Sequence, residues 1–152
     1  MKLVFDIETD DIKATKIWCI VAIDEDNNIK TFDPDNIEEG IKYLQQADTL
    51  IGHNILGFDI PVIKDLYGVD LYNKKIIDTL VISRLINPNK EKGHSLQNWG
   101  FILGQNKGTP PEDFTIYSKD MLDYCVLDVE LNKKLYHHLQ QHVKGFPVTI
   151  SF

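Results

Sequence analysis

The chain begins with apolar runs of the kind that form buried strands. Leu3 to Glu8, Ile17 to Ile23 and Ile29 to Phe32 are rich in β-branched residues and separated by polar turns, so they predict three consecutive strands. After Phe32, segments with apolar residues three and four apart, typical of amphipathic helices, alternate with short strands. Helices are predicted at Ile37 to Gln46, Phe58 to Tyr67, Thr79 to Ile86, Ser95 to Leu103 and Ser118 to Val143, and further strands at Thr49 to Gly52 and Lys75 to Asp78.

This order of elements predicts an α/β fold in a single domain covering residues 1–152. The length fits one domain with a substantial core, and 43% hydrophobic with 26% charged residues is ordinary for a globular protein. Residues 145–152 form an apolar tail beyond the last helix. The tail either packs on the domain or docks on a partner by adding a strand. We favour packing on the domain, because exposed apolar tails are a liability.

Two acidic residues end the first predicted strand. Residues two apart in a strand point to the same side, so Asp6 and Glu8 are expected to project together. Two carboxylates that close repel each other unless a cation lies between them. Asp-x-Glu is also common in turns, so taken alone this block is equally compatible with a turn, although chance is a poor explanation for acids that end an apolar strand.

Two other blocks carry acids in comparable settings. Tyr124 and Asp128 are four apart in the last predicted helix and share one face, although taken alone they are better explained as a solvated Asp beside a half-buried Tyr. Asp59 lies at the start of a helix with Pro61 in its first turn, and on its own it is explained as a helix cap. Asp78, within an apolar stretch, is expected to order the site rather than bind metal.

Together these blocks resemble the three motifs of the DnaQ-like 3′-5′ exonucleases, in the DEDDy subgroup whose last motif carries Tyr. The motifs are Phe5-Asp6-Ile7-Glu8-Thr9, Asn54 to Asp59 and Tyr124 to Asp128. Segments 77–86 and 93–104 further resemble the proofreading domain of T-seven-like phage (family A) DNA polymerases. The resemblance extends from Met1 to His142. It implies a ribonuclease-H-like fold with a mixed five-stranded sheet flanked by helices.

The resemblance also implies roles for the catalytic residues. In similar enzymes the first Asp bridges two Mg²⁺ or Mn²⁺ ions, which makes Asp6 the bridge here. Glu8 and Asp128 are then expected on the metal beside the nucleophile, and Asp59 near the metal beside the leaving group. Such a pair of ions, about 3.5 to 4 Å apart, stabilises both oxygens of an in-line displacement at phosphorus. Tyr124 is expected to orient the attacking water, because its high pKa makes it a poor base.

Five neighbours of these motifs are candidate substrate-binding residues. Thr9 and Asp10 follow the metal-binding strand, where similar enzymes meet the terminal nucleotide. Asn54 is a candidate for hydrogen-bonding the substrate or fixing its loop, and His53 precedes it. Phe58 is either a core residue or an aromatic that stacks on a base. Thr9 is equally well explained as a turn residue.

The charge balance at first argues against a nucleic-acid enzyme. The formal net charge is −7, from 16 basic and 23 acidic residues, whereas binding to phosphates needs local positive charge. Two divalent ions would compensate in part at the site. Weak, salt-sensitive and distributive binding to short single-stranded 3′ ends is therefore expected. The nearest basic groups in sequence are Lys13, Lys16, Lys74, Lys75, Lys90, Lys92 and Lys107.

The sequence predicts no membrane segment, since no apolar run is long enough, and no signal peptide, since acidic residues begin at Asp6. Cys19 and Cys125 lie in separate apolar segments and are expected to be reduced core residues. These features fit the cytoplasm of a bacterial or phage-infected cell.

Three functions are compatible with these observations. The leading one is a metal-dependent 3′-5′ exonuclease that hydrolyses single-stranded DNA to nucleoside 5′-monophosphates, with a role in proofreading. The alternatives are an exoribonuclease acting on short RNA and a non-catalytic module that binds nucleic acid or a replication partner. Because the resemblance is to one domain of a longer polymerase, the chain is free-standing, acts with a separate DNA polymerase, or is a piece of one.

Overall fold

The computed structural model describes residues 1–105, 108–142 and 150–151, and its elements follow the predicted order. The five predicted helices and five predicted strands are all present, with small shifts at their ends. The elements are β1 (Lys2–Thr9), β2 (Ile17–Ile23), β3 (Ile29–Phe32), α1 (Ile37–Gln45), β4 (Thr49–Gly52), α2 (Ile60–Tyr67), β5 (Lys75–Asp78), α3 (Thr79–Ile86), α4 (Leu96–Leu103), α5 (Lys119–His142) and β6 (Ile150–Ser151).

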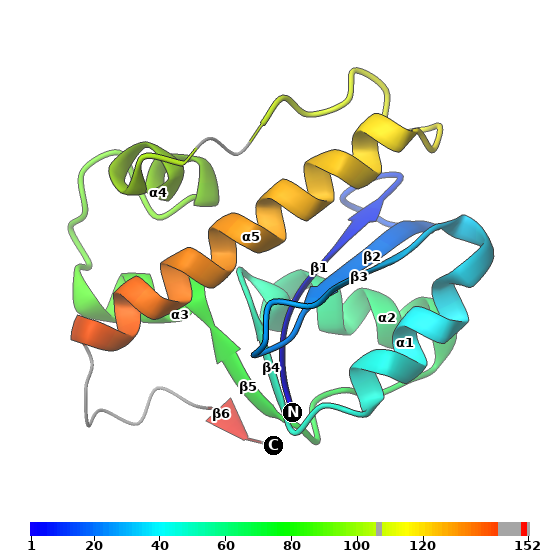
Figure 1. The fold of residues 1–152 in the computed structure, drawn as a ribbon, viewed down its shortest axis with the longest axis horizontal. Helices are drawn as coiled ribbons and strands as arrows, with labels where there is room; N and C mark the ends of the chain where they lie inside the picture. The colour runs from blue at the N-terminus through cyan, green and yellow to red at the C-terminus, as the bar shows by residue number, and fades with distance from the viewer. Residues whose placement is uncertain (106–107, 143–149, 152) are drawn as a thin grey trace.

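The strands form one mixed sheet in the order β3-β2-β1-β4-β5-β6. The pairs β3–β2 and β2–β1 are antiparallel, whereas β1–β4 and β4–β5 are parallel. The predicted mixed sheet of five strands flanked by helices is therefore confirmed, and the short strand β6 extends it at one edge (Figure 1). In β6, Ile150 and Ser151 pair antiparallel with β5 of the same domain, whereas residues 143–149 and 152 of the predicted tail lie outside the described residues.

Helices cover both faces of the sheet, and β1 contributes to both cores. Leu3, Phe5 and Ile7 pack on the face covered by α1 and α2. Val4 packs on the opposite face, which α5 crosses (Figure 1). Asp6 and Glu8 continue the alternation that begins at Val4, so both carboxylates project toward α5. The pairing with β2 becomes irregular between Glu8 and Thr9, directly after the second acid.

A tight turn connects β4 to α2. Residues Ile55–Asp59 form one π-helical turn, and Asn54 before it adopts a left-handed conformation with φ of 61°. Asp59 itself has helical backbone angles, and its side chain makes no capping hydrogen bond to α2. The explanation of Asp59 as an ordinary helix cap therefore fails, and its carboxylate is available for other contacts.

Within the described residues, no helix is both long and apolar enough to span a membrane. Cys19 and Cys125 are buried and not joined in a disulfide, as predicted.

Candidate active site

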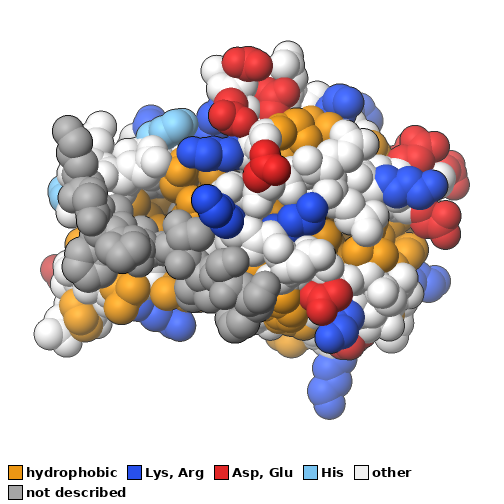
Figure 2. Space-filling model, turned by 90° about the horizontal axis from the view of Figure 1, so that it is seen from below, with side chains coloured by type: hydrophobic (Ala, Val, Ile, Leu, Met, Phe, Trp, Pro, Cys, Tyr) orange, Lys and Arg blue, Asp and Glu red, His pale blue; other side chains and the backbone are white. Residues whose placement is uncertain are grey.

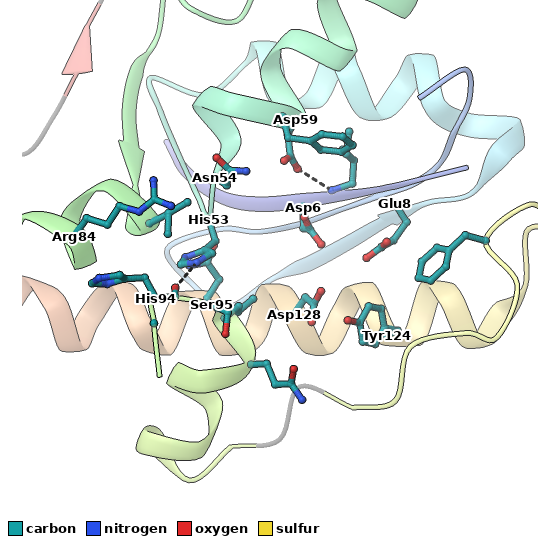
Figure 3. Close-up of a pocket in the computed structure, with 18 residues that line it drawn as sticks. Asp6, Glu8, His53, Asn54, Asp59, Arg84, His94, Ser95, Tyr124 and Asp128 are labelled. Atoms are coloured by element: carbon teal, nitrogen blue, oxygen red, sulfur yellow. Dashed lines mark hydrogen bonds between the residues drawn. The ribbon is translucent and has the colours of Figure 1, made fainter. Parts of the chain in front are cut away.

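A pocket of about 780 Å³ brings the three acidic blocks together beside the C-terminal half of β1 and one face of α5. Asp6, Glu8, Asp59 and Asp128 all line it, together with Tyr124 (Figure 3). They come from β1, the turn before α2, and α5, elements far apart in the sequence. The pocket also includes three of the five predicted substrate-binding residues, His53, Asn54 and Phe58.

The acids on β1 face a buried thiol on α5. One side-chain oxygen of Asp6, one of Glu8 and the sulfur of Cys125 all lie within 4.8 Å of one another. The Cys125 Sγ is 3.7 Å from both the backbone oxygen and the Oδ2 of Asp6. Burial raises the pKa of the Cys125 thiol well above its ordinary value, and a hydrogen bond with Cys19 and the charge of Asp6 raise it further. The thiol therefore stays protonated and donates to Asp6, while the carboxylates supply the oxygens suited to Mg²⁺ or Mn²⁺.

Asp59 is the most deeply buried of the four acids, with only 3% of its surface exposed. Its Oδ2 accepts a hydrogen bond of 3.2 Å from the backbone N–H of Ile7, which lies between Asp6 and Glu8 (Figure 3). Burial raises the pKa of the Asp59 carboxyl well above its ordinary value, and the negative charge of Asp6 adds to that shift. Two carboxyl groups are thus crowded together in a poorly solvated place, which is unfavourable unless a proton or a cation is shared.

Tyr124, Asp128 and Asn132 form a row on the pocket face of α5, each four residues from the next. The Asn132 amide donates a 2.8 Å hydrogen bond to the hydroxyl of Thr79. That hydroxyl lies 3.2 Å from the carbonyl of Gly52 at the end of β4. The row on α5 is therefore fixed to the sheet at the end where β4 and β5 stop.

His53 connects this network to the segment before α4. Its Nε2 lies 2.9 Å from the carbonyl oxygen of His94, and its Nδ1 lies 2.8 Å from the Thr79 hydroxyl. Because a carbonyl can only accept, Nε2 carries a proton and donates it. His53 therefore holds the residues that precede α4 against the pocket, which is a structural role in addition to the substrate-binding role predicted for it.

The residues that precede α4 also contact α3. The Trp99 indole donates a 2.9 Å hydrogen bond to Ser83 Oγ, which lies 2.6 Å from His94 Nδ1. An indole N–H can only donate, so Ser83 Oγ accepts from Trp99 and donates its own proton to His94 Nδ1. Burial lowers the pKa of His94, which agrees with a neutral ring that accepts this proton.

Asp78 shapes the turn that carries Asn54. Its carboxylate accepts hydrogen bonds from the backbone N–H groups of Asn54, Leu56 and Leu80, and the last of these caps α3. This agrees with its predicted ordering role. Gly57 lies in the same turn, where a Cβ would be 2.6 Å from the Asn54 side-chain oxygen, so a larger residue there would displace the Asn54 side chain.

The remaining predicted substrate-binding residues, Thr9 and Asp10, line an adjoining hollow of about 360 Å³ rather than the main pocket. Asp10 accepts hydrogen bonds from Thr15 and Lys16, which lower its pKa to about 2. The hollow shares Ile7, Glu8, Phe58 and Phe114 with the main pocket. Its two phenylalanines give it an aromatic wall.

Several lining residues were not predicted from the sequence. Asn132 had a usable signal, since it continues the four-residue spacing of Tyr124 and Asp128. Arg84 lies four residues after Leu80 on α3, and both side chains line the pocket. No lysine is among the described residues that line it. The others are Ile7, Gly93, His94, Ser95, Leu96, Gln97 and Phe114.

Replacing Asp59 with asparagine should stabilise the metal-free protein. Because the folded-state pKa of Asp59 lies above its ordinary value of 3.8, the folded chain binds this proton more tightly than the unfolded chain. The stabilisation from this group is complete below that value and is lost as the pH rises through the folded-state pKa. In EDTA at about pH 8, Asp59→Asn should raise Tm by about 2 to 8 °C, measured by calorimetry.

Glu39→Gln, an exposed acid on α1, is the matched control and should move Tm by less than about 1 °C. An equal fall in stability of wild type and Asp59→Asn between pH values near 4 and 8 would contradict the prediction.

Comparison with known proteins shows relatives of this chain both in sequence and in fold. Residues 2–144 match the model of the 3′-5′ exonuclease family. The DNA-directed DNA polymerase of Enterobacteria phage T3 is 28% identical over 200 residues, covering 99% of this chain and 28% of the polymerase. That of Escherichia phage T7 is 29% identical over 143 residues, covering 68% of this chain and 20% of the polymerase. The chain thus spans between a fifth and a third of these relatives.

Among solved structures, NrnC from Brucella melitensis has the same fold, with a TM-score of 0.77, 18% identity, and coverage of 96% of this chain and 76% of NrnC. NrnC is also known with bound Mg²⁺ and bound to pGG, with TM-scores of 0.76 and 0.74. The predicted ribonuclease-H-like fold is confirmed by this likeness. Since the family match spans nearly every residue from the first strand to the last helix, this chain belongs to the 3′-5′ exonuclease family.

Proposed function

We propose that this chain hydrolyses single-stranded DNA from its 3′ end and releases nucleoside 5′-monophosphates, using two divalent metal ions. The observation that carries the proposal is the crowding of the buried Asp59 against Asp6 in one pocket with Glu8 and Asp128. Such crowding costs free energy in the absence of a cation, so it is expected where cations bind.

The carboxylates supply the hard oxygen ligands that Mg²⁺ and Mn²⁺ prefer. Asp6 is the residue that both ions would share, with Glu8 and Asp128 on one and Asp59 beside the other. When bound, the ions supply Lewis acidity to the phosphate and lower the pKa of the attacking water. The hydrogen bond from the Ile7 backbone to Asp59 ties the Asp59 carboxylate to β1 between Asp6 and Glu8, which holds the turn before α2 against this strand.

Tyr124 would position the attacking water through its hydroxyl. It is 8% exposed and lines the pocket one helical turn from Asp128. Tyr124→Phe should lower kcat by about 10- to 100-fold with little change in KM, because orientation is lost while substrate contacts remain. Tyr136→Phe, on the same helix but away from the pocket, is the control for loss of a hydroxyl. An equal effect of both substitutions on kcat would argue against a positioning role for Tyr124.

The adjoining hollow supports binding of a strand end. Phe58 and Phe114 offer aromatic surface on which the terminal base can stack beside Glu8. On the face in Figure 2, Lys and Arg side chains lie among acidic ones rather than in one basic surface. With a net charge of −7, binding is therefore expected to depend on the pocket and its ions, and to be weak at high salt.

The polymerase relatives favour DNA as the substrate and proofreading beside a polymerase as the setting. The fold shared with NrnC keeps an exoribonuclease as the second candidate, because the four acids do not read the sugar. A non-catalytic binding module is the third, and the complete set of acids with Tyr124 argues against it.

The test is a time course on four 5′-labelled substrates in Mg²⁺: single-stranded DNA, RNA of the same sequence, a duplex with a mismatched 3′ end, and the same duplex with a paired 3′ end. We expect a ladder shortened from the 3′ end of DNA, and faster removal of the mismatched end than of a paired one. Faster cleavage of RNA would replace the proposal with the second candidate. If none of the substrates is cleaved, the non-catalytic binding module is the remaining candidate function.

A further inference from the structure

Arg84 is the one arginine among the 16 Lys and Arg residues of the chain, and it lines the active-site pocket. It is exposed on α3, and none of the ion pairs among the described residues includes it. Among the described residues, Arg84 is the only Lys or Arg that lines this pocket, which also holds four acids. Arg84 is therefore not within ion-pair distance of any of these acids.

The packing of α3 directs Arg84 into the pocket. Ser83 is completely buried, and its hydroxyl is held by Trp99 and His94. Asp78 fixes the start of the helix by capping it. With these contacts on the inner side of α3, Leu80 and Arg84, one turn apart, share the face that lines the pocket.

Arg84 lies at the end of the pocket formed by α3, whereas Glu8 and Tyr124 lie at the other end (Figure 3). The hollow with Phe58 and Phe114 adjoins the Glu8 end. A strand whose last nucleotide occupies that hollow has its scissile phosphate at the acids, so the rest of the strand extends toward α3.

We propose that Arg84 binds a phosphodiester of the strand on the 5′ side of the bond that is cleaved. A guanidinium presents its donors as a planar fork that matches two phosphate oxygens, which an ammonium cannot do. Arg84 would thereby position the strand and offset the negative charge that the acids give the pocket. This inference rests on the proposed function, since it takes the strand direction from it.

A set of single-stranded DNA oligonucleotides tests the proposal, each with the terminal linkage unmodified and one phosphodiester on its 5′ side replaced by a neutral methylphosphonate. For wild type, one particular linkage should be sensitive, with kcat/KM lowered about 10- to 100-fold by its neutralisation. Arg84→Gln should show the same fall in kcat/KM already on unmodified DNA. Neutralising the sensitive linkage should then lower kcat/KM of this variant no further. Arg84→Lys, which keeps the charge without the fork, should lie between the two.

Lys42→Gln, an exposed charge on α1, is the matched control and should leave the whole profile as in wild type. If the loss of kcat/KM caused by Arg84→Gln and the loss caused by a neutral linkage multiply at every linkage, the assignment of Arg84 is wrong while the exonuclease proposal stands. The same holds if Arg84→Gln cleaves DNA at the wild-type rate. If wild type cleaves nothing, the proposed function fails. The assignment is then decided by fluorescence anisotropy with single-stranded DNA in EDTA at low salt. Weaker DNA binding by Arg84→Gln than by wild type supports the contact. Equal DNA binding by the two proteins, or no DNA binding by either, overturns it.

Discussion

A chain carrying Asp6→Ala together with Glu8→Ala should degrade single-stranded DNA at least about a thousandfold more slowly than wild type, while remaining folded. The pair supplies the strand-borne carboxylates of the site, and both are only partly buried, so their loss removes ligands without opening the core. Removal of two crowded charges should leave Tm in EDTA unchanged or raised. Gel analysis of product ladders and a thermal melt give the two measurements.

Glu38→Ala with Glu39→Ala is the matched control, because it removes two exposed acids from the first turn of α1 on the opposite face of the sheet. It should retain wild-type activity. Unchanged DNA degradation by the Asp6 and Glu8 double variant would refute the catalytic assignment, and a lowered Tm with lost activity would identify misfolding instead.

Removing divalent ions with EDTA should abolish cleavage to below about a thousandth of the starting rate, and excess Mg²⁺ or Mn²⁺ should restore it. The same ions should raise Tm of wild type at about pH 8, since a cation relieves the repulsion between Asp6 and Asp59 and binds only the folded chain. Activity and melting curves are measured on one sample across an ion titration.

The Asp6 and Glu8 double variant separates site binding from general ionic effects, because it should gain little Tm from the same ions. Cleavage that persists in EDTA would contradict the metal proposal. So would an equal gain in Tm for wild type and the double variant.

The parts of the site that depend on local periodicity were predictable from the sequence. The two-residue period of β1 puts Asp6 and Glu8 on one side, and the four-residue spacing on α5 aligns Tyr124 with Asp128. The strands and helices were predictable for the same reason, since each buries a face marked by its own pattern.

Contacts between distant segments were not predictable in this way. The hydrogen bond from Ile7 to Asp59 joins residues 52 positions apart, and it explains why Asp59 does not cap α2. Arg84 carries no local signal, because its place in the pocket is set by the packing of Ser83 against Trp99 and His94. The division of the five predicted substrate-binding residues was likewise not predictable, since Thr9 and Asp10 line the smaller hollow, His53 and Asn54 line the main pocket, and Phe58 lines both.

The alternation along β1 makes the active site sensitive to the length of this strand. Phe5 and Ile7 fill the core beneath α1 and α2, while Asp6 and Glu8 occupy the other side. One inserted or deleted residue between Leu3 and Asp6 would exchange the two sides relative to Leu3, placing the carboxylates in that core instead of in the pocket. Homologous chains can therefore vary in their loops, but their insertions and deletions should avoid this strand.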